Sequence, residues 1–140
     1  MYLSFEKWHG NGNDFIIINS IEDELKITKN KIIKISDRNT GIGFDQLIKI
    51  DLPTKPNQDF FIRFFNADGS EAGMCLNGIR CAAKYIWNNS FAPIGAVNFQ
   101  TKTKNIICEP KANNKIQVNV DSPDKIMHKS LHNKLKNKFV

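Results

Sequence analysis

The chain has 140 residues, of which 41% are hydrophobic, and this size and composition suit one domain with an apolar core. No apolar run approaches the roughly 20 residues that span a bilayer, and the N-terminus lacks the basic-then-apolar layout of a secretion signal. Three cysteines without a CxxC pair match neither a disulfide framework nor a zinc pattern. We therefore expect a cytoplasmic protein that binds no metal and no membrane.

The formal net charge of +6 is concentrated near the C-terminal end. Five lysines and no acidic residue lie in the last sixteen positions, and these lysines account for all but one of the net positive charges. They are Lys125, Lys129, Lys134, Lys136 and Lys138. This distribution favours a solvated basic tail over residues 121–140 behind a nearly neutral body over residues 1–120. Nucleic-acid binding through the tail is a weaker alternative, and we expect no nucleic-acid partner.

The first half of the chain is predicted to form four strands and one short helix. Apolar alternation and β-branched runs predict strands over residues 2–8, 15–18, 46–51 and 60–65. Polar residues and glycines predict turns over 9–14 and 66–70. Between them, Thr28 is a plausible N-cap for a helix with Ile32, Ile33 and Ile35 on one face, ending at Gly41.

The second half is predicted to form a longer helix followed by strands. The helix is expected over residues 77–89, with Ile79, Ala82, Ala83 and Ile86 buried. Strands are expected over 96–101, 105–109 and 115–120, with turns between them. Six to eight strands with two helices in mixed order predict an α+β domain.

Cys75 stands directly before the first turn of that longer helix. A thiol there lies at the positive end of the helix dipole, beside backbone N–H groups with no helical partner. This setting favours the thiolate, which can act as a base, and the same N–H groups can bind a carboxylate. A buried structural cysteine is the alternative. Cys81 and Cys108 are interpreted as structural residues.

Four short motifs together resemble the diaminopimelate epimerase family. They are HGNGNDF at 9–15, GIGFDQ at 41–46, FNADGS at 65–70 and ADGSEAGMCLNGIRC at 67–81. They occur in the order and at the spacing of that family. The resemblance extends over residues 1–120 and implies a curved mixed or antiparallel sheet wrapped around a central helix.

The resemblance implies a chemistry as well as a fold. Members invert LL-2,6-diaminopimelate to the meso form, in lysine and peptidoglycan precursor synthesis, with two thiols and no cofactor. Cys75 matches the first catalytic thiol. The implied substrate-binding residues are Asn13, Gln46, Asn66, Leu76 and Asn77. Without the resemblance, Asn13 and Asn66 read as turn residues, Gln46 as a strand-edge residue and Asn77 as a helix cap.

The chain departs from the family pattern at two places. Leu76 replaces a family glycine, so its side chain is expected to crowd the carboxylate site or to strain the turn. The chain also ends near half the usual family length, so we expect only the first half-site. The basic tail then reads as a degenerate end or the start of a linker to an absent second domain. A homodimer is one arrangement that would supply a second acid.

Two further hypotheses follow from these departures. The chain would be an inactive remnant or a scaffold if the half-site does not work. A relative with the same architecture and another substrate, such as a proline-racemase-like or phenazine-pathway isomerase, is the other alternative. The HGNGNDF and ADGSE motifs count against that second alternative.

Overall fold

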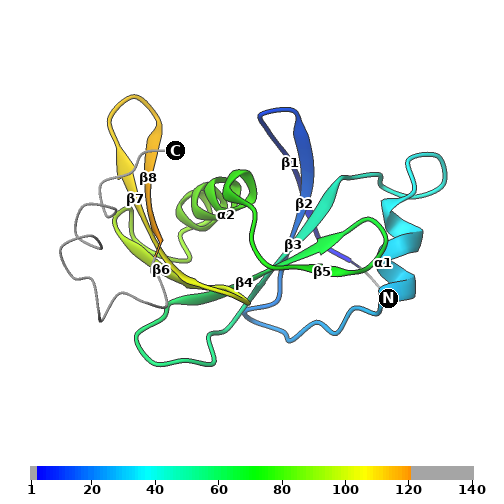
Figure 1. Cartoon of the computed structure of the whole chain (residues 1–140), viewed down its shortest axis with the longest axis horizontal. Coiled ribbons are helices and arrows are strands. Elements are labelled where there is room, and N and C mark those ends of the chain that lie inside the picture. Colours follow the sequence, from blue (N-terminus) through cyan, green and yellow to red (C-terminus); the bar gives the residue numbers. More distant parts are fainter. Residues whose placement is uncertain (1–2, 121–140) are drawn as a thin grey trace.

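The computed structural model describes residues 3–120, and this part of the chain forms eight strands and two helices (Figure 1). In chain order they are β1 (Glu6–Gly10), β2 (Asn13–Asn19), α1 (Lys29–Ser36), β3 (Gln46–Asp51), β4 (Phe60–Asn66), β5 (Glu71–Ala72), α2 (Leu76–Asn88), β6 (Val97–Gln100), β7 (Asn105–Lys111) and β8 (Lys115–Val120). The predicted basic tail lies outside the described residues.

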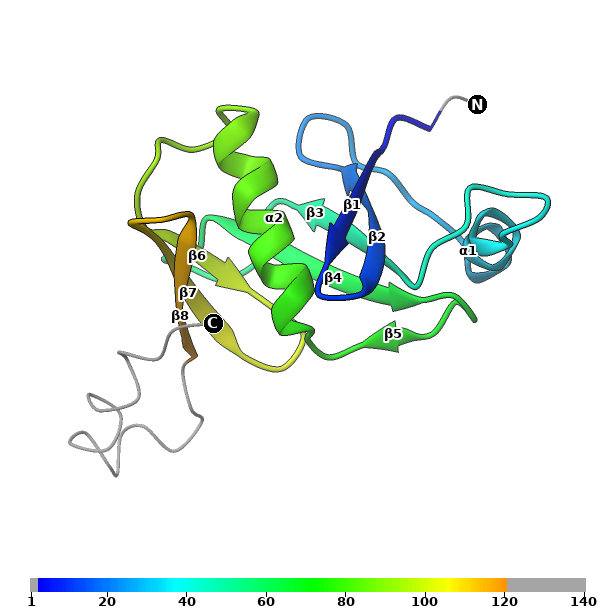
Figure 2. The same cartoon turned by 90° about the horizontal axis from the view of Figure 1, so that it is seen from above.

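All eight strands belong to one curved, mixed sheet. Their order is β1-β2-β3-β4-β6-β7-β8, and β5 pairs with β4 beside this path. The β2–β3 and β4–β6 pairs are parallel and the others are antiparallel. Figure 1 and Figure 2 show that the sheet curves around α2, with the β1–β2 hairpin on one side of the helix and the β7–β8 hairpin on the other. The predicted α+β fold with a central helix is confirmed.

Both faces of the central strands are buried, which explains the unbroken apolar run of β2. Side chains point alternately to the two faces of a strand. Phe15 and Ile17 join the large core around α2. Ile16 and Ile18 instead join a smaller core that contains Ile32 of α1. Each helix therefore covers its own face of the sheet.

Close packing of α2 on the sheet depends on Gly78, in the first turn of the helix. A Cβ at this position would lie 2.6 Å from Cε1 of Phe64 and 3.3 Å from Cδ1 of Ile48. Both side chains are fully buried, so neither can move aside easily. Glycine thus allows the start of α2, and with it Cys75, to lie directly against β3 and β4.

Most predicted elements are confirmed. The errors lie where pairing between strands sets the bounds of an element. The first strand is shifted to Glu6–Gly10 because its ladder with β2 continues to the Gly10–Asn13 pair. The predicted turn over 9–14 narrows to Asn11 and Gly12, both with positive φ. Strand β5 was not predicted, since two residues leave no periodic pattern.

For the helices, too, some predictions are confirmed and others are wrong. Thr28 caps α1 as predicted, and its hydroxyl accepts a hydrogen bond from the Lys31 amide at 3.1 Å. That helix ends at Ser36, well before Gly41. Ile33 is 43% exposed, so it does not share the buried face of Ile32. Neither described helix combines the length and apolar character needed to cross a membrane.

Candidate active site at the start of helix α2

Cys75 is the N-cap residue of α2. Its backbone is extended, with φ −139° and ψ 117°, and its Sγ accepts a hydrogen bond from the Gly78 amide at 3.5 Å. The first intrahelical bond runs from the Ile79 amide to the Cys75 carbonyl at 2.9 Å. The amides of Leu76 and Asn77 precede that bond and therefore have no intrahelical acceptor. They are the donors that an anion at this helix end would use.

The charge pattern of α2 leaves its dipole uncompensated at both ends. The first turn holds no acidic residue and the last turn no basic residue, although such residues would stabilise the helix. The residues that line a groove of about 340 Å³ beside the first turn include Asn77, Arg80, Lys84 and Lys115. Positive potential from these side chains adds to that of the helix end. This end of the molecule is therefore suited to an anionic ligand.

Leu76 is the first residue of the helix and is 41% exposed. Its φ is not positive, so its backbone does not need the conformational freedom of glycine. Of the two effects expected from leucine here, strain of the turn is therefore not found. Crowding of the neighbouring amides stays a prediction.

Asn77 ties the first turn of α2 to the β1–β2 hairpin. Its Nδ2 donates to Oδ1 of Asn13 at 3.2 Å, and its Oδ1 accepts from Nδ2 of Asn11 at 3.2 Å. The Arg80 guanidinium donates to the same Oδ1. The bonds to Asn13 and Asn11 join residues more than sixty positions apart in the chain. The Asn77 amide is thus held in one orientation by three neighbours.

Gln46 and Asn66 form a second pair on adjacent strands. They are register partners at the ends of β3 and β4, and Gln46 Nε2 donates to Asn66 Oδ1 at 3.0 Å. Asn66 Nδ2 donates to the Ser70 hydroxyl at 3.1 Å, and that hydroxyl donates to Asp68 at 2.6 Å. Hydrogen bonds from Ser70 hold the pKa of Asp68 below its usual value.

A brace of charged residues, not identified from the sequence, supports Asn13. The Asp14 carboxylate accepts two hydrogen bonds from Arg38 at 2.9 Å each and one from the Asp45 amide at 2.8 Å, and pairs with Lys7 at 2.9 Å. Asp45 in turn accepts from the Asp14 amide at 3.1 Å and from Asn13 Nδ2 at 3.4 Å. Hydrogen bonding to Arg38, above all, holds the pKa of Asp14 far below its usual range.

The brace could have been suspected from the motifs. Asp14 and Asp45 belong to the HGNGNDF and GIGFDQ motifs, immediately beside the two predicted binding residues Asn13 and Gln46. Arg38 carries no such signal, because it lies in no motif and reaches Asp14 only in the folded chain.

All the predicted site residues lie at one end of the sheet. Strand β2 begins at Asn13, β3 begins at Gln46 and β4 ends at Asn66, and the register places these ends side by side. The bond between Asn13 and Asn77 adds the start of α2 to the group. The hydrogen bond of the Cys75 thiol goes to Gly78, within its own helix turn, and to neither asparagine pair.

The other two thiols are part of the core. Cys81 is 6% exposed and burial raises its pKa. Cys108 is fully buried, which raises its pKa to about 12. Neither thiol can serve as a base at neutral pH in this arrangement. Cys75 is half-buried and is the most exposed of the three thiols.

Comparisons with known proteins identify the family of the chain. The family model described as "Diaminopimelate epimerase" matches residues 5–126. A diaminopimelate epimerase from Acinetobacter baylyi is 38% identical over 128 residues, which cover 91% of this chain and 46% of that protein. The chain therefore belongs to the diaminopimelate epimerase family, and it spans about half the length of this curated relative.

Solved structures share the fold at low identity. A methylitaconate-delta-isomerase matches with a TM-score of 0.66 at 17% identity, over 81% of this chain and 35% of that one. A Bacillus anthracis phenazine biosynthesis protein of the PhzF family matches with a TM-score of 0.55 at 15% identity, over 84% of this chain and 38% of that one. These likenesses concern the fold alone.

Proposed function

We propose that this chain provides one thiol half-site for the epimerisation of diaminopimelate. The observation that carries the proposal is Cys75 at the N-cap of α2, next to two backbone amides that have no helical acceptor. The amides of Leu76 and Asn77 would bind the α-carboxylate of the substrate, and the thiolate of Cys75 would face the α-carbon. Asn13, Gln46 and Asn66 would bind the polar groups of the rest of the molecule.

The proposed reaction moves protons and needs no cofactor. The Cys75 thiolate takes the α-proton, and the electron pair of the broken C–H bond spreads into the carboxylate group. Amide donors fixed at this carboxylate stabilise the added negative charge without having to reorient. A proton delivered to the opposite face of the carbon then completes the inversion, and the proton on Cys75 is released to solvent.

Inversion requires a second acid on the opposite face of the substrate. Among residues 3–120, Cys81 and Cys108 are buried in the core, so neither can deliver a proton to the opposite face of the substrate. We propose that a group outside residues 3–120 supplies that proton, from a further domain or from a second copy of the chain. A half-site acting alone would exchange the α-proton and retain the configuration.

One observation favours a second candidate function, that of a non-catalytic relative. Leu76 places a branched side chain at the two amides on which carboxylate binding would depend. If this side chain blocks the amides, the domain keeps its fold and cannot bind the substrate. The substitution Leu76→Gly should then tighten substrate binding, and an unchanged or weaker affinity removes the crowding argument.

The decisive experiment follows the α-proton of LL- and meso-diaminopimelate in D₂O by NMR, with chiral separation of the products. The control Cys75→Ser keeps an N-cap that accepts a hydrogen bond and replaces the thiol with a far weaker acid. Epimerised, deuterated product that is lost in the control shows a complete two-base site. Deuterium uptake with retained configuration shows the half-site. No exchange in the folded chain supports the non-catalytic candidate.

A further inference from the structure

Four side chains form a continuous chain of hydrogen bonds across the candidate active site. The Arg80 guanidinium donates to Oδ1 of Asn77, and Asn77 Nδ2 donates to Oδ1 of Asn13 at 3.2 Å. Asn13 Nδ2 then donates to Oδ2 of Asp45 at 3.4 Å. This chain of bonds connects α2, the first residue of β2 and the residue before β3, and every bond in it runs in the same direction.

The two end groups can form hydrogen bonds in one direction only. A guanidinium has N–H donors and no acceptor, whereas a carboxylate accepts and does not donate. The amides of Asn77 and Asn13 differ from both, because a half-turn exchanges the donor and the acceptor of an amide. The amides alone would therefore leave the direction open. Arg80 at one end and Asp45 at the other decide which atoms of each amide are used inside the protein.

Of the two end groups, Arg80 sets the direction more firmly. Its bond to Asn77 is charge-assisted, and both residues are half-buried. The bond between Asn13 and Asp45 is long, at 3.4 Å, and both residues are exposed. Asn11 also donates to Asn77 Oδ1, at 3.2 Å, but its own amide can turn and imposes no direction. Among residues 3–120 the Arg80 guanidinium pairs with no carboxylate, so this bond is the described use of its N–H groups.

With this direction, Asn77 offers a ligand a donor and no acceptor. Both lone pairs of its Oδ1 are occupied, by Asn11 and by Arg80. The Nδ2 atoms of Asn77 and Asn13 each carry two hydrogens, and one hydrogen on each has no partner among residues 3–120. A guanidinium that donates to Oδ1 also polarises the Asn77 amide, which strengthens its N–H donors. A carboxylate can use these donors, whereas an ammonium group cannot.

We propose that Arg80 is a positioning residue of the candidate site. By donating to Asn77 Oδ1, it keeps one N–H group of Asn77 and one of Asn13 available for a carboxylate of the ligand. Arg80 acts through Asn77 and not by contact with the ligand. The inference rests on the proposed function, since diaminopimelate is the ligand that supplies the carboxylate.

The test is the affinity of the ¹⁵N-labelled 140-residue chain for meso-diaminopimelate, measured by two-dimensional NMR titration at pH 7 and constant ionic strength. Arg80→Met removes both the charge and the donor. Lys84→Met removes the same charge from the same groove, one helical turn further on, where Lys84 forms no hydrogen bond within residues 3–120. This control measures the share of the effect that charge alone explains. Arg80→Lys keeps a charged group that can only donate. The urea midpoint of each variant reports its folding.

We expect Arg80→Met to bind about tenfold more weakly than the native chain, Lys84→Met less than about threefold, and Arg80→Lys within about threefold of the native affinity. Arg80→Met should unfold at the same urea midpoint as Lys84→Met. The inference is overturned if Arg80→Met binds as tightly as Lys84→Met. It is also overturned if Arg80→Met unfolds at a lower midpoint and Arg80→Lys does not restore binding, because the role of Arg80 is then structural.

Failure of this inference can be told apart from failure of the proposed function. If the native chain does not bind meso-diaminopimelate, the proposed function is refuted and the inference with it. If the native chain binds and Arg80→Met binds equally well, the inference alone is refuted, and the proposal for Cys75 stands.

Discussion

The two ends of helix α2 carry polar groups in opposite states. Near Cys75 the side chains are tied to one another, as Asn77 is to Asn13, Asn11 and Arg80. Near Tyr85 the polar groups face solvent: the carboxylates of Glu6, Glu22 and Asp23 are exposed, and the Tyr85 hydroxyl, which has no hydrogen-bond partner among residues 3–120, is not a buried atom. The first end is held by hydrogen bonds within the protein, whereas the second is not. Polar substitutions should therefore cost more stability at the first end than at the second.

Thiol reactivity gives the strongest test of the difference between the two ends of α2. Iodoacetamide should label Cys75 at least about a hundredfold faster than Cys108 at pH 7.5, because Cys108 is fully buried and its pKa is raised to about 12. Cys81 should also label slowly, although it lies on the same helix. Peptide mapping by mass spectrometry gives the three rates. Comparable labelling of Cys81 would show that the start of α2 opens readily and is not a fixed site.

The substitution Gly78→Ala should destabilise the end of α2 near Cys75. A methyl group 2.6 Å from a carbon of Phe64 overpacks the core, and the helix-propensity gain of about 1 kcal/mol offsets this only in part. We expect a net loss of about 1–2 kcal/mol in unfolding free energy, measured in urea. Gly95→Ala is the control, since a Cβ there has no atom within 4 Å. Equal stability of the two variants would refute the packing argument.

Asp14→Asn should also destabilise the end near Cys75, by about 2 kcal/mol, because charged hydrogen bonds to Arg38 and Lys7 are lost. The pKa of Asp14 is lower in the folded chain than in the unfolded one. Its stabilisation is therefore complete above the ordinary value of about 4 and is lost as pH falls below it. Unfolding between pH 2 and 7 should show this loss in the native chain and less of it in Asp14→Asn. The exposed Glu24→Gln should behave like the native chain.

Tyr85→Phe should have the smallest effect. Removing a solvent-reachable hydroxyl that has no hydrogen-bond partner among residues 3–120 leaves no group unsatisfied, so we expect the unfolding free energy to change by less than about 1 kcal/mol. Thermal unfolding measures this difference. A clear loss of stability would mean that the hydroxyl makes a stabilising contact, and the contrast between the two ends of α2 would fail.

The sequence by itself determined the local elements and the family. Capping and periodicity, which act between near neighbours in the chain, explain the N-cap at Thr28, the bounds of β3 and β8, and the position of Cys75 directly before α2. The four motifs indicated the family that the comparisons establish. The predicted binding residues were identified from the motifs too, although their positions in space were not.

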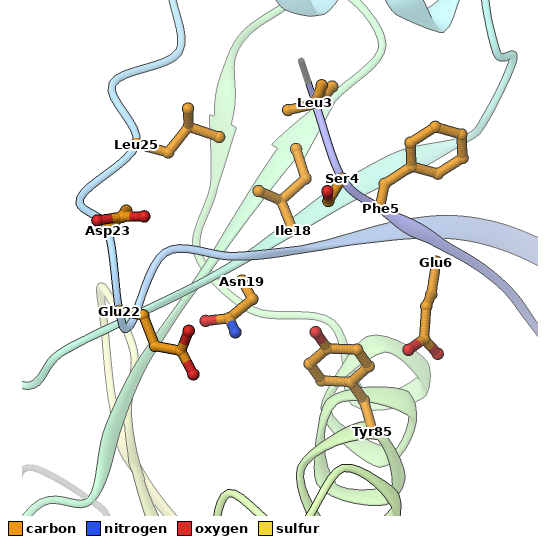
Figure 3. Close-up of a pocket in the computed structure, with 10 residues that line it drawn as sticks. All are labelled: Leu3, Ser4, Phe5, Glu6, Ile18, Asn19, Glu22, Asp23, Leu25 and Tyr85. Atoms are coloured by element: carbon orange, nitrogen blue, oxygen red, sulfur yellow. The ribbon is translucent and has the colours of Figure 1, made fainter.

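Only the tertiary structure decided which groups meet. The bonds from Arg38 to Asp14 and from Asn77 to Asn13 cross 24 and 64 positions of the chain, and no local pattern encodes them. The two-residue strand β5 exists because β4 offers an edge to pair with. A pocket of about 430 Å³ arises where residues 3–6, the end of β2 and Tyr85 of α2 come together (Figure 3). Long-range pairing and packing select these contacts, because each depends on the position of elements that are distant in sequence.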